Sequence, residues 1–263
     1  MTSSLTEARA WASELELLDE RDWCQFELCR EAQALVVVVG PKVPPRHSRS
    51  CHSQQVHTRS VPDLARVIEF ITADARHGRF VQWGTSTVVD ENTGEPVIDR
   101  PLFDALHAAA GIDAEYPIGN AGVIHVYGYW FSTALTPYGY KRDRWQNGEL
   151  AAALGEPSAA FRLTGDAEST PLQRITAATL PLLQEPPANA ASAEVRVGDS
   201  DTRVVLTSHS PSASWALIYG IRSDHAGWRM ITTFPLAGDT DAVIADFMND
   251  RRLRWNAALS PNL

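Results

Sequence analysis

The C-terminal part of the chain constrains the fold more than any other segment, because short runs of β-branched and aromatic residues alternate with turn residues. Four such runs follow one another: 194–197, 202–208, 215–222 and 228–234. Turns that contain Gly198 and Gly227 separate the first pair and the second pair, a pattern typical of β-hairpins. Asp239 can then cap a final helix whose buried face we expect to be Val243, Ile244, Phe247 and Met248. The segment predicts an antiparallel β-meander followed by a helix.

The rest of the chain mixes helical and extended patterns. Apolar residues at helical spacing, bounded by capping residues and glycines, predict helices over 5–19, 64–77, 99–110, 147–154 and 172–183. Extended runs predict strands over 34–39 and 123–131, and a hairpin that joins 80–90 to 96–99 across residues 91–94. Strand pairs joined by short turns, with helices around them, indicate an α+β fold with a largely antiparallel sheet and flanking helices.

The chain of 263 residues is long enough for one large domain or two small ones. We expect an N-terminal α/β part over 1–155 and a C-terminal antiparallel sheet plus helix over 156–263, with a single domain as the alternative. Residues 41–60 are rich in Pro, Arg, Ser and His and poor in large apolar residues, which predicts a flexible loop.

Charge and composition exclude several classes of function. The net charge of −9 makes an overall attraction to nucleic acid or to an anionic membrane unfavourable. The longest strictly apolar run, 34–39, is far shorter than the ~20 residues of a membrane-spanning helix. Three cysteines are too few for a disulfide framework, which favours a reducing cytoplasm. We therefore expect a soluble, cytoplasmic protein that binds neither nucleic acid nor membrane.

Several common catalytic motifs are absent from the sequence. No Gly-x-Gly-x-x-Gly follows a predicted strand, and there is no Gly-x-x-x-x-Gly-Lys-Ser/Thr, so a nicotinamide, flavin or P-loop nucleotide cofactor is disfavoured. Gly-x-Ser-x-Gly and His-Glu-x-x-His are missing as well. We expect no cofactor.

Aromatic residues are concentrated in the segment 123–145, which holds four of the six tyrosines. On a strand, His125, Tyr127 and Tyr129 share one face, which would place an imidazole and two phenols in a row. Such a row can transfer protons and stack on a planar ligand. We therefore predict His125 as a catalytic acid or base, with Tyr127 and Tyr129 as donors to a developing oxyanion. The alternative is a core strand with a purely structural role.

Basic residues follow directly after these aromatic residues. Lys141, Arg142 and Arg144 form the densest basic cluster of this acidic chain, and Asp143 could orient one of them. Cations beside aromatic rings suit a carboxylate or phosphate on a cyclic or aromatic ligand. The predicted substrate-binding residues are Tyr138, Tyr140, Lys141, Arg142 and Arg144. A solvated basic loop is the alternative.

A second group of reactive side chains lies in the polar segment 41–60. His47, Cys51, His52 and His57 are competent zinc ligands, but their spacing matches no common zinc motif. We favour a solvated loop without a metal, and a zinc site or a mobile lid over an active site are the alternatives. Cys24 and Cys29 are expected to be small buried residues on a helix.

The C-terminal hairpins also resemble, over about twenty residues, the closing strands of small bacterial ribonuclease toxins. That resemblance would give acid, base and phosphate-binding roles to His209, His225, Arg222 and Arg229. The acidic charge and the long N-terminal extension argue against it.

The sequence as a whole favours an enzyme that acts on a small, anionic, cyclic or aromatic metabolite by acid–base chemistry, of a lyase, cyclase or hydrolase type. Lys42 and Lys141 are the only lysines among 23 basic residues, which indicates GC-rich bacterial coding and a setting in specialised, antibiotic-type metabolism. A non-catalytic module that binds a small molecule or a protein is the main alternative.

Overall fold

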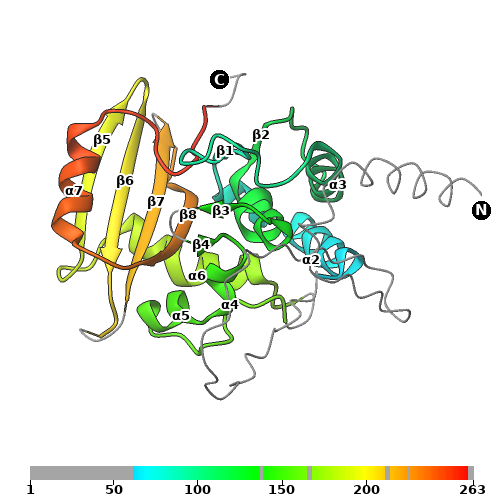
Figure 1. Ribbon diagram of the computed structural model, residues 1–263, viewed down its shortest axis with the longest axis horizontal. Helices are drawn as coiled ribbons and strands as arrows, with labels where there is room; N and C mark the ends of the chain where they lie inside the picture. Colours follow the sequence, from blue (N-terminus) through cyan, green and yellow to red (C-terminus); the bar gives the residue numbers. More distant parts are fainter. Residues whose placement is uncertain (1–61, 137–138, 165–167, 211–213, 224–225, 260–263) are drawn as a thin grey trace, which may run out of the picture. The chain divides into compact units, whose positions relative to one another are not determined.

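A four-stranded antiparallel sheet dominates the C-terminal part of the chain (Figure 1). The computed structural model describes residues 62–136, 139–164, 168–210, 214–223 and 226–259, apart from the side chain of Arg144. The predicted helix 5–19, strand 34–39 and loop 41–60 lie outside these residues. In the described part, the α+β class and the C-terminal meander predicted from the sequence are confirmed.

The strands of this sheet follow one another in chain order. They are β5 (Ala191–Val197), β6 (Ser200–Thr207), β7 (Trp215–Ser223) and β8 (Arg229–Leu236). Val197 pairs with Ser200, so the first turn is tighter than the sequence suggests and consists of Gly198 and Asp199. Gly198 has a φ of 58°, a left-handed conformation that glycine adopts without steric cost.

Helix α7 (Thr240–Asn249) covers one face of the sheet, where it packs against β5 and β6 (Figure 1). The Asp239 side chain caps this helix, as predicted, by accepting from the backbone N–H groups of Asp241 and Ala242. Phe247 is buried against Tyr219 of β7. Met248 was expected on the same face but is 56% exposed, because it follows Phe247 directly and therefore points away from the sheet.

The opposite face of the sheet is covered by helices of the preceding chain. The described helices before the sheet are α2 (Leu64–Arg76), α3 (Arg100–Ala110), α4 (Asp143–Gln146), α5 (Glu149–Leu154) and α6 (Pro171–Gln184). Helices α5 and α6 contact β7 and β8. The predicted helix ends are confirmed at Asp63 and Asp99, whose carboxylates accept from backbone N–H groups, and at Gly111 and Gly155, which are left-handed.

Two sequence predictions in the first half of the described chain need correction. The hairpin between 80–90 and 96–99 is reduced to a bridge between Val89 and Pro96. Strand β1 (Thr85–Thr87) instead pairs with the distant β2 (Ile118–Asn120), and a 3₁₀ turn, η2 (Arg79–Gln82), precedes it. A turn signal predicts a local partner, whereas the actual partner of β1 is set by tertiary packing.

The expected strand 123–131 is wrong, because this segment is helical. It forms a π-helical turn, η3 (Val123–Tyr127), and then a 3₁₀ turn, η4 (Gly128–Phe131). Asn120 caps the start, since its side-chain oxygen accepts from the backbone N–H groups of Gly122 and Val123. The apolar run is buried on all sides, and periodicity alone cannot distinguish a buried strand from a buried helix.

A single hydrophobic core joins these elements. It contains residues from both sides of residue 155. Trp83, for example, is buried and donates its indole N–H to the hydroxyl of Thr176 on α6, at 2.9 Å. No helix in the described ranges is long and apolar enough to cross a membrane.

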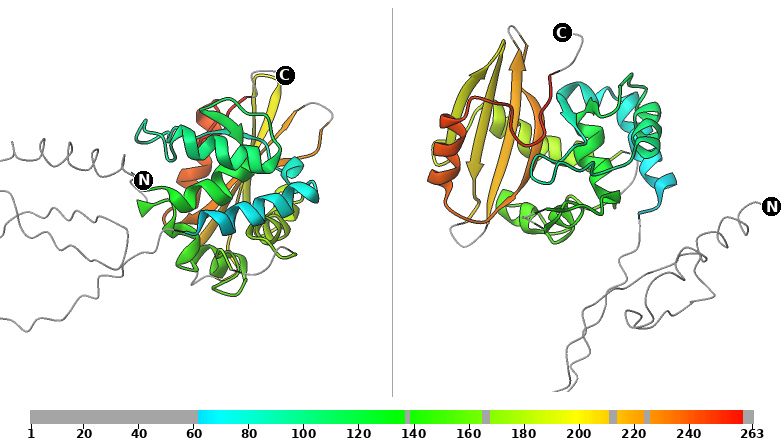
Figure 2. Two further views of the ribbon diagram at one scale, coloured as in Figure 1. Left: turned by 90° about the vertical axis from the view of Figure 1, so that its right-hand side faces the viewer. Right: turned by 45° about the horizontal axis from the view of Figure 1, so that its top comes forward.

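The C-terminal segment returns from α7 to β1. Figures 1 and 2 show it in red as it crosses the sheet. Ala257 bridges to Ser86, and the backbone N–H of Thr87 donates to the carbonyl oxygen of Asn256 at 2.8 Å. This return places residues 252–256 beside the helical turns η3 and η4 and beside β8.

Candidate active site

A cavity of about 140 Å³ lies where the C-terminal segment meets β8 and the helical turns η3 and η4. Its walls are formed by Asp90, Glu91, Asn92, His125, Tyr129, Lys141, Thr232, Phe234, Arg252, Arg254, Trp255 and Asn256. Three of the predicted site residues, His125, Tyr129 and Lys141, therefore line one cavity. We refer to it as the Tyr129 cavity.

The π-helical turn places His125 and Tyr129 on the same side of the chain. The backbone N–H of Gly128 donates to the carbonyls of both Ile124 and Val123, which is the wide hydrogen-bond pattern of a π turn. Residues four apart in a helical segment are neighbours, and the two rings lie 4.5 Å apart between centroids. π turns occur often at functional sites.

Tyr127 lies on the opposite side of this turn, so it does not share a face with His125 and Tyr129 as the predicted strand required. It is fully buried and donates its hydroxyl to the carboxylate of Asp74 on α2. Burial, the negative charge of Asp74 and this hydrogen bond raise the pKa of the Tyr127 phenol well above its ordinary value. Asp74 also accepts from Thr170 at 2.6 Å and from Arg79 at 2.8 Å. Tyr127 therefore belongs to a buried network that joins α2 to the start of α6.

The imidazole of His125 is held at both nitrogens. Its Nε2 lies 2.7 Å from the hydroxyl of Ser86, and its Nδ1 lies 2.8 Å from the hydroxyl of Thr232. Ser86 is also 2.8 Å from the carbonyl oxygen of Asn256. A hydroxyl has one proton, so Ser86 donates either to His125 or to this carbonyl, and the tautomer of His125 changes accordingly. Ser86 does not line the cavity, which makes it a positioning group for the imidazole.

The hydroxyl of Tyr129 is the centre of the site. Lys141 donates to its oxygen at 3.3 Å, and the side-chain amide of Asn256 donates at 3.1 Å. A phenol oxygen has two lone pairs, so these two donors leave its own proton free to be donated. The nearest described acceptor is Nε2 of His125, at 3.4 Å. Tyr129 is thus arranged as a hydrogen-bond donor toward His125 or toward a ligand.

Lys141 forms a buried ion pair with Asp90. Its ammonium nitrogen is 2.5 Å from one carboxylate oxygen of Asp90, and the two side chains are 6% and 1% exposed. The other oxygen accepts from the backbone N–H groups of Asn92 and Thr93. Burial alone would raise the pKa of Asp90, but the hydrogen bond and positive charge of Lys141, helped by these N–H groups, outweigh it and hold the pKa below its ordinary value. The carboxylate of Asp90 therefore stays charged at neutral pH.

The C-terminal wall of the cavity has an unusual backbone. Trp255 and Asn256 have φ angles of 50° and 65°, in the left-handed region that bulky residues rarely adopt. The side chain of Glu91 accepts from the backbone N–H of Trp255 at 2.8 Å, and the side-chain oxygen of Asn256 accepts from that of Glu91 at 3.1 Å. Such conformations persist where surrounding contacts enforce them, and they cluster at ligand sites.

Two arginines of the same segment complete the cavity. Arg254 donates to Asp246 at 2.5 Å, and its Nη1 lies 3.7 Å from a carboxylate oxygen of Asp250, beyond hydrogen-bond distance. Its buried Nε and Nη1 atoms therefore have no hydrogen-bond acceptor among the described residues. Arg252 is exposed and pairs with Asp250 at 2.6 Å. A buried donor without an acceptor costs about 1–3 kcal/mol, so an acceptor carried by a ligand would stabilise Arg254.

The other predicted substrate-binding residues lie outside the cavity or outside the described atoms. The guanidinium of Arg142 stacks over the ring of Tyr140 at 5.1 Å, and both side chains are partly buried next to the cavity. Tyr138 and the side chain of Arg144 are not among the described residues and atoms. Asp143, expected to orient a cation, lies 3.6 Å from Arg142.

Three residues of the cavity were not predicted from the sequence: Asp90, Asn256 and Arg254. The Asp90 segment shows a turn signal, which the structure confirms, but nothing local indicates that its second carboxylate oxygen pairs with Lys141. Asn256 and Arg254 reach the site only because the chain returns from α7 to β1. The single local signal is at Asn256, because asparagine tolerates left-handed φ angles.

The remaining groups singled out in the sequence lie partly outside the described residues. His47, Cys51, His52 and His57 lie outside the described residues, and in the described part no three His, Cys, Asp or Glu side chains are placed to hold a metal. Of the residues tied to the ribonuclease resemblance, Arg222 pairs with Asp201 at 3.0 Å, whereas Arg229 lines a different pocket. His225 is not described.

The sequence and the structure were compared with protein-family models, with curated proteins and with solved structures, and none of the three comparisons finds a match.

Proposed function

We propose that this protein is an enzyme that acts on a small anionic molecule of about one ring by acid–base chemistry without a nucleotide cofactor, and that the Tyr129 cavity is its active site. The observation that carries the proposal is the arrangement around the Tyr129 hydroxyl. Lys141 and Asn256 donate to the oxygen of this hydroxyl, and Nε2 of His125 lies 3.4 Å away as an acceptor for its proton.

The roles of the residues follow from these contacts. Tyr129 donates its proton, or a strong hydrogen bond, to an oxygen of the substrate that gains negative charge during the reaction. His125 exchanges protons with Tyr129, and Ser86 and Thr232 fix its ring. Lys141 and Asn256 stabilise the negative charge that Tyr129 acquires when its proton leaves, because both donate to its oxygen.

The enclosure of the site supports an enzyme over a non-catalytic binding module. His125 and Tyr129 are 2% and 6% exposed, so their side chains are shielded from bulk water, and electrostatic interactions are stronger there than at the surface. A module that binds its partner through aromatic residues would present them on an open surface. Tyr127 and Tyr129 are instead turned inward.

The size and charge of the cavity define the class of substrate. Its volume of about 140 Å³ is close to the ~150 Å³ of a protein cavity that holds one benzene molecule. Phe234 and Trp255 give it apolar walls, and Arg254 brings buried donors that lack acceptors. A single ring with a carboxylate directed to Arg254 satisfies both features.

The composition suggests where such an enzyme works. Three cysteines and a net charge of −9 suit the reducing cytoplasm, and the preference for arginine over lysine suits a GC-rich bacterium with a specialised metabolism.

Benzoate and its neutral isostere benzamide test the proposed substrate class. We expect benzoate to bind in a titration followed by calorimetry, and benzamide to bind about tenfold more weakly because it lacks the charge. Arg254→Gln should remove this preference, whereas Arg100→Gln, on an exposed face of α3 outside the cavity, should retain it. Equal binding of the two probes, or no saturable benzoate binding at millimolar concentration, would contradict the proposal.

A further inference from the structure

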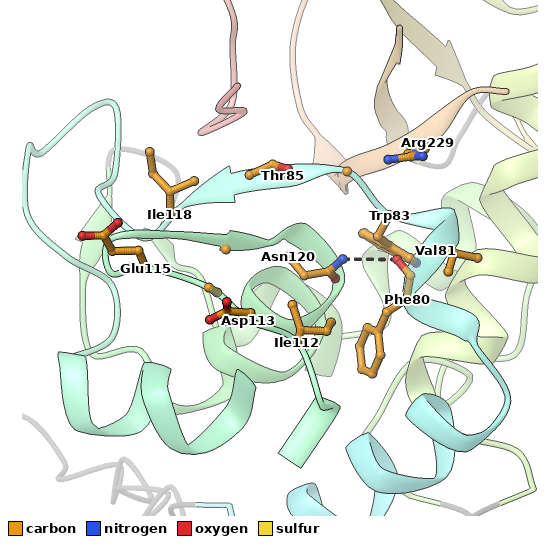
Figure 3. Close-up of a pocket in the computed structure, with 13 residues that line it drawn as sticks. Phe80, Val81, Trp83, Thr85, Ile112, Asp113, Glu115, Ile118, Asn120 and Arg229 are labelled. Carbon is orange, nitrogen blue, oxygen red and sulfur yellow. Dashed lines mark hydrogen bonds between the residues drawn. The ribbon is translucent and has the colours of Figure 1, made fainter. Parts of the chain in front are cut away.

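A second and larger pocket lies on the other side of β1, and it shares no lining residue with the Tyr129 cavity (Figure 3). Its volume is about 490 Å³, within the range of ~300–1,000 Å³ that is usual for small-molecule sites. It is bounded by η2 and the start of β1, by β2, by the segment that follows α3, and by the first residue of β8.

The walls of this pocket combine apolar and polar side chains. Phe80 and Trp83 form part of the hydrophobic core and border the pocket, and Ile112 and Ile118 are half-buried on its other walls. Val81 at the rim is 72% exposed, which is unusual for a large aliphatic residue at a pocket mouth. A ligand with an apolar body would cover this surface and gain hydrophobic stabilisation.

Three charged side chains that line the pocket form no ion pair with one another or with other described residues. Arg229 lies on one side of the pocket, and Asp113 and Glu115 lie on the opposite side (Figure 3). None of the three side chains makes an ion pair or a hydrogen bond with any described residue. Asn120, between them, is held in the fold, because its amide donates to the carbonyl of Phe80 at 3.2 Å and its oxygen caps η3.

We propose that this pocket binds a linear zwitterion, with an ammonium group and a carboxylate at opposite ends of an apolar body. The carboxylate pairs with Arg229, the ammonium group lies between Asp113 and Glu115, and the apolar body rests on the walls formed by Trp83 and Ile112. A ligand with one charge would leave the opposite side of the pocket unpaired. An α-amino acid carries both charged groups on one carbon, so it has no apolar body between its two charges.

Four six-carbon probes test this arrangement: 6-aminohexanoate, hexanoate, hexylamine and norleucine. Norleucine is an isomer of 6-aminohexanoate that carries both charges at one end. We expect 6-aminohexanoate to bind at least about fivefold more tightly than each of the other three, which is the scale of one exposed ion pair. Binding is measured by calorimetry, or by NMR titration where it is weak.

Charge variants assign the two ends of the ligand. Arg229→Gln should weaken 6-aminohexanoate binding about fivefold and leave hexylamine binding unchanged. The double variant Asp113→Asn with Glu115→Gln should weaken 6-aminohexanoate binding about fivefold and leave hexanoate binding unchanged. All three side chains are exposed, so folding should be retained. Arg100→Gln, on an exposed face of α3, is the matched control. Equal binding of the four probes, no saturation at millimolar concentration, or 6-aminohexanoate binding that the charge variants leave unchanged would overturn the proposal.

Discussion

Replacing Lys141 by methionine is the perturbation whose effect follows most directly from the structure. The substitution keeps an unbranched side chain of similar length but removes the positive charge 2.5 Å from Asp90. The carboxylate of Asp90, 1% exposed, then lacks a counter-charge, although it keeps the backbone N–H groups of Asn92 and Thr93. Removing one partner of a buried ion pair costs about 3–5 kcal/mol. We expect about 3 kcal/mol, because those N–H groups remain.

The matched double variant separates the ion pair from the loss of the side chain. In Lys141→Met with Asp90→Asn no buried charge remains, and the asparagine oxygen can still accept from Asn92 and Thr93. We expect its free energy of unfolding to lie within about 1–2 kcal/mol of the wild-type value, because replacing a buried ion pair by neutral side chains often changes stability little. The coupling energy between the two sites should therefore be at least about 1 kcal/mol.

Urea unfolding at neutral pH measures these free energies. The single variant should also melt roughly 6–12 °C below the wild type, at about 2–4 °C per kcal/mol for a domain of this size. Because the pKa of Asp90 is lowered in the folded state, its stabilising contribution is present above the ordinary carboxyl pKa and is lost as the pH falls through the lowered value. A cost below about 1 kcal/mol for Lys141→Met, or equal costs for the single and double variants, would refute this reasoning.

Three further outcomes follow from other buried contacts. Burial lowers the pKa of His107, whose Nε2 accepts from the backbone N–H of Asn120. The free energy of unfolding should therefore be highest above the ordinary histidine pKa and decrease as the pH falls below it. Urea unfolding from about pH 7.5 to about pH 5 should show a smaller decrease in His107→Gln than in the wild type. Gly220→Ala should lower the melting temperature by the equivalent of about 1–3 kcal/mol, because a Cβ there would lie 2.6 Å from a backbone carbonyl oxygen of β8. Tyr127→Phe should cost about 1–3 kcal/mol in unfolding free energy, because it leaves the buried carboxylate of Asp74 without one donor, and it should not change benzoate affinity.

Elements with local signals could be predicted from the sequence. Helix α3 begins at the capping Asp99 and ends at Gly111, whose left-handed φ of 64° suits glycine, and both residues were identified from their type and position. The meander was identified in the same way, from alternating runs and glycine turns. These signals depend on residues close together in the chain, so tertiary structure need not be known.

Elements set by distant contacts could not be predicted in the same way. The segment 123–131 has the composition of a strand, yet the cap from Asn120 and burial on all sides make it helical. The site shows the same division. His125, Tyr129 and Lys141 were found because they lie in one unusual stretch, whereas Asp90 and Asn256 reach Tyr129 and Lys141 through chain separations that no local pattern records.

The most direct test of the central claim, acid–base chemistry at Tyr129, is the exchange of a carbon-bound proton in D₂O. Phenylpyruvate offers one ring, a carboxylate and a C–H group acidified by a neighbouring carbonyl, and deuterium incorporation can be followed by ¹H NMR. We expect the wild type to accelerate exchange above the buffer rate, Tyr129→Phe to lose about 10²-fold of that acceleration, and Tyr127→Phe to retain it, because only the Tyr129 hydroxyl faces the cavity. Exchange at the buffer rate with the wild type, or equally fast exchange with Tyr129→Phe, would contradict the account.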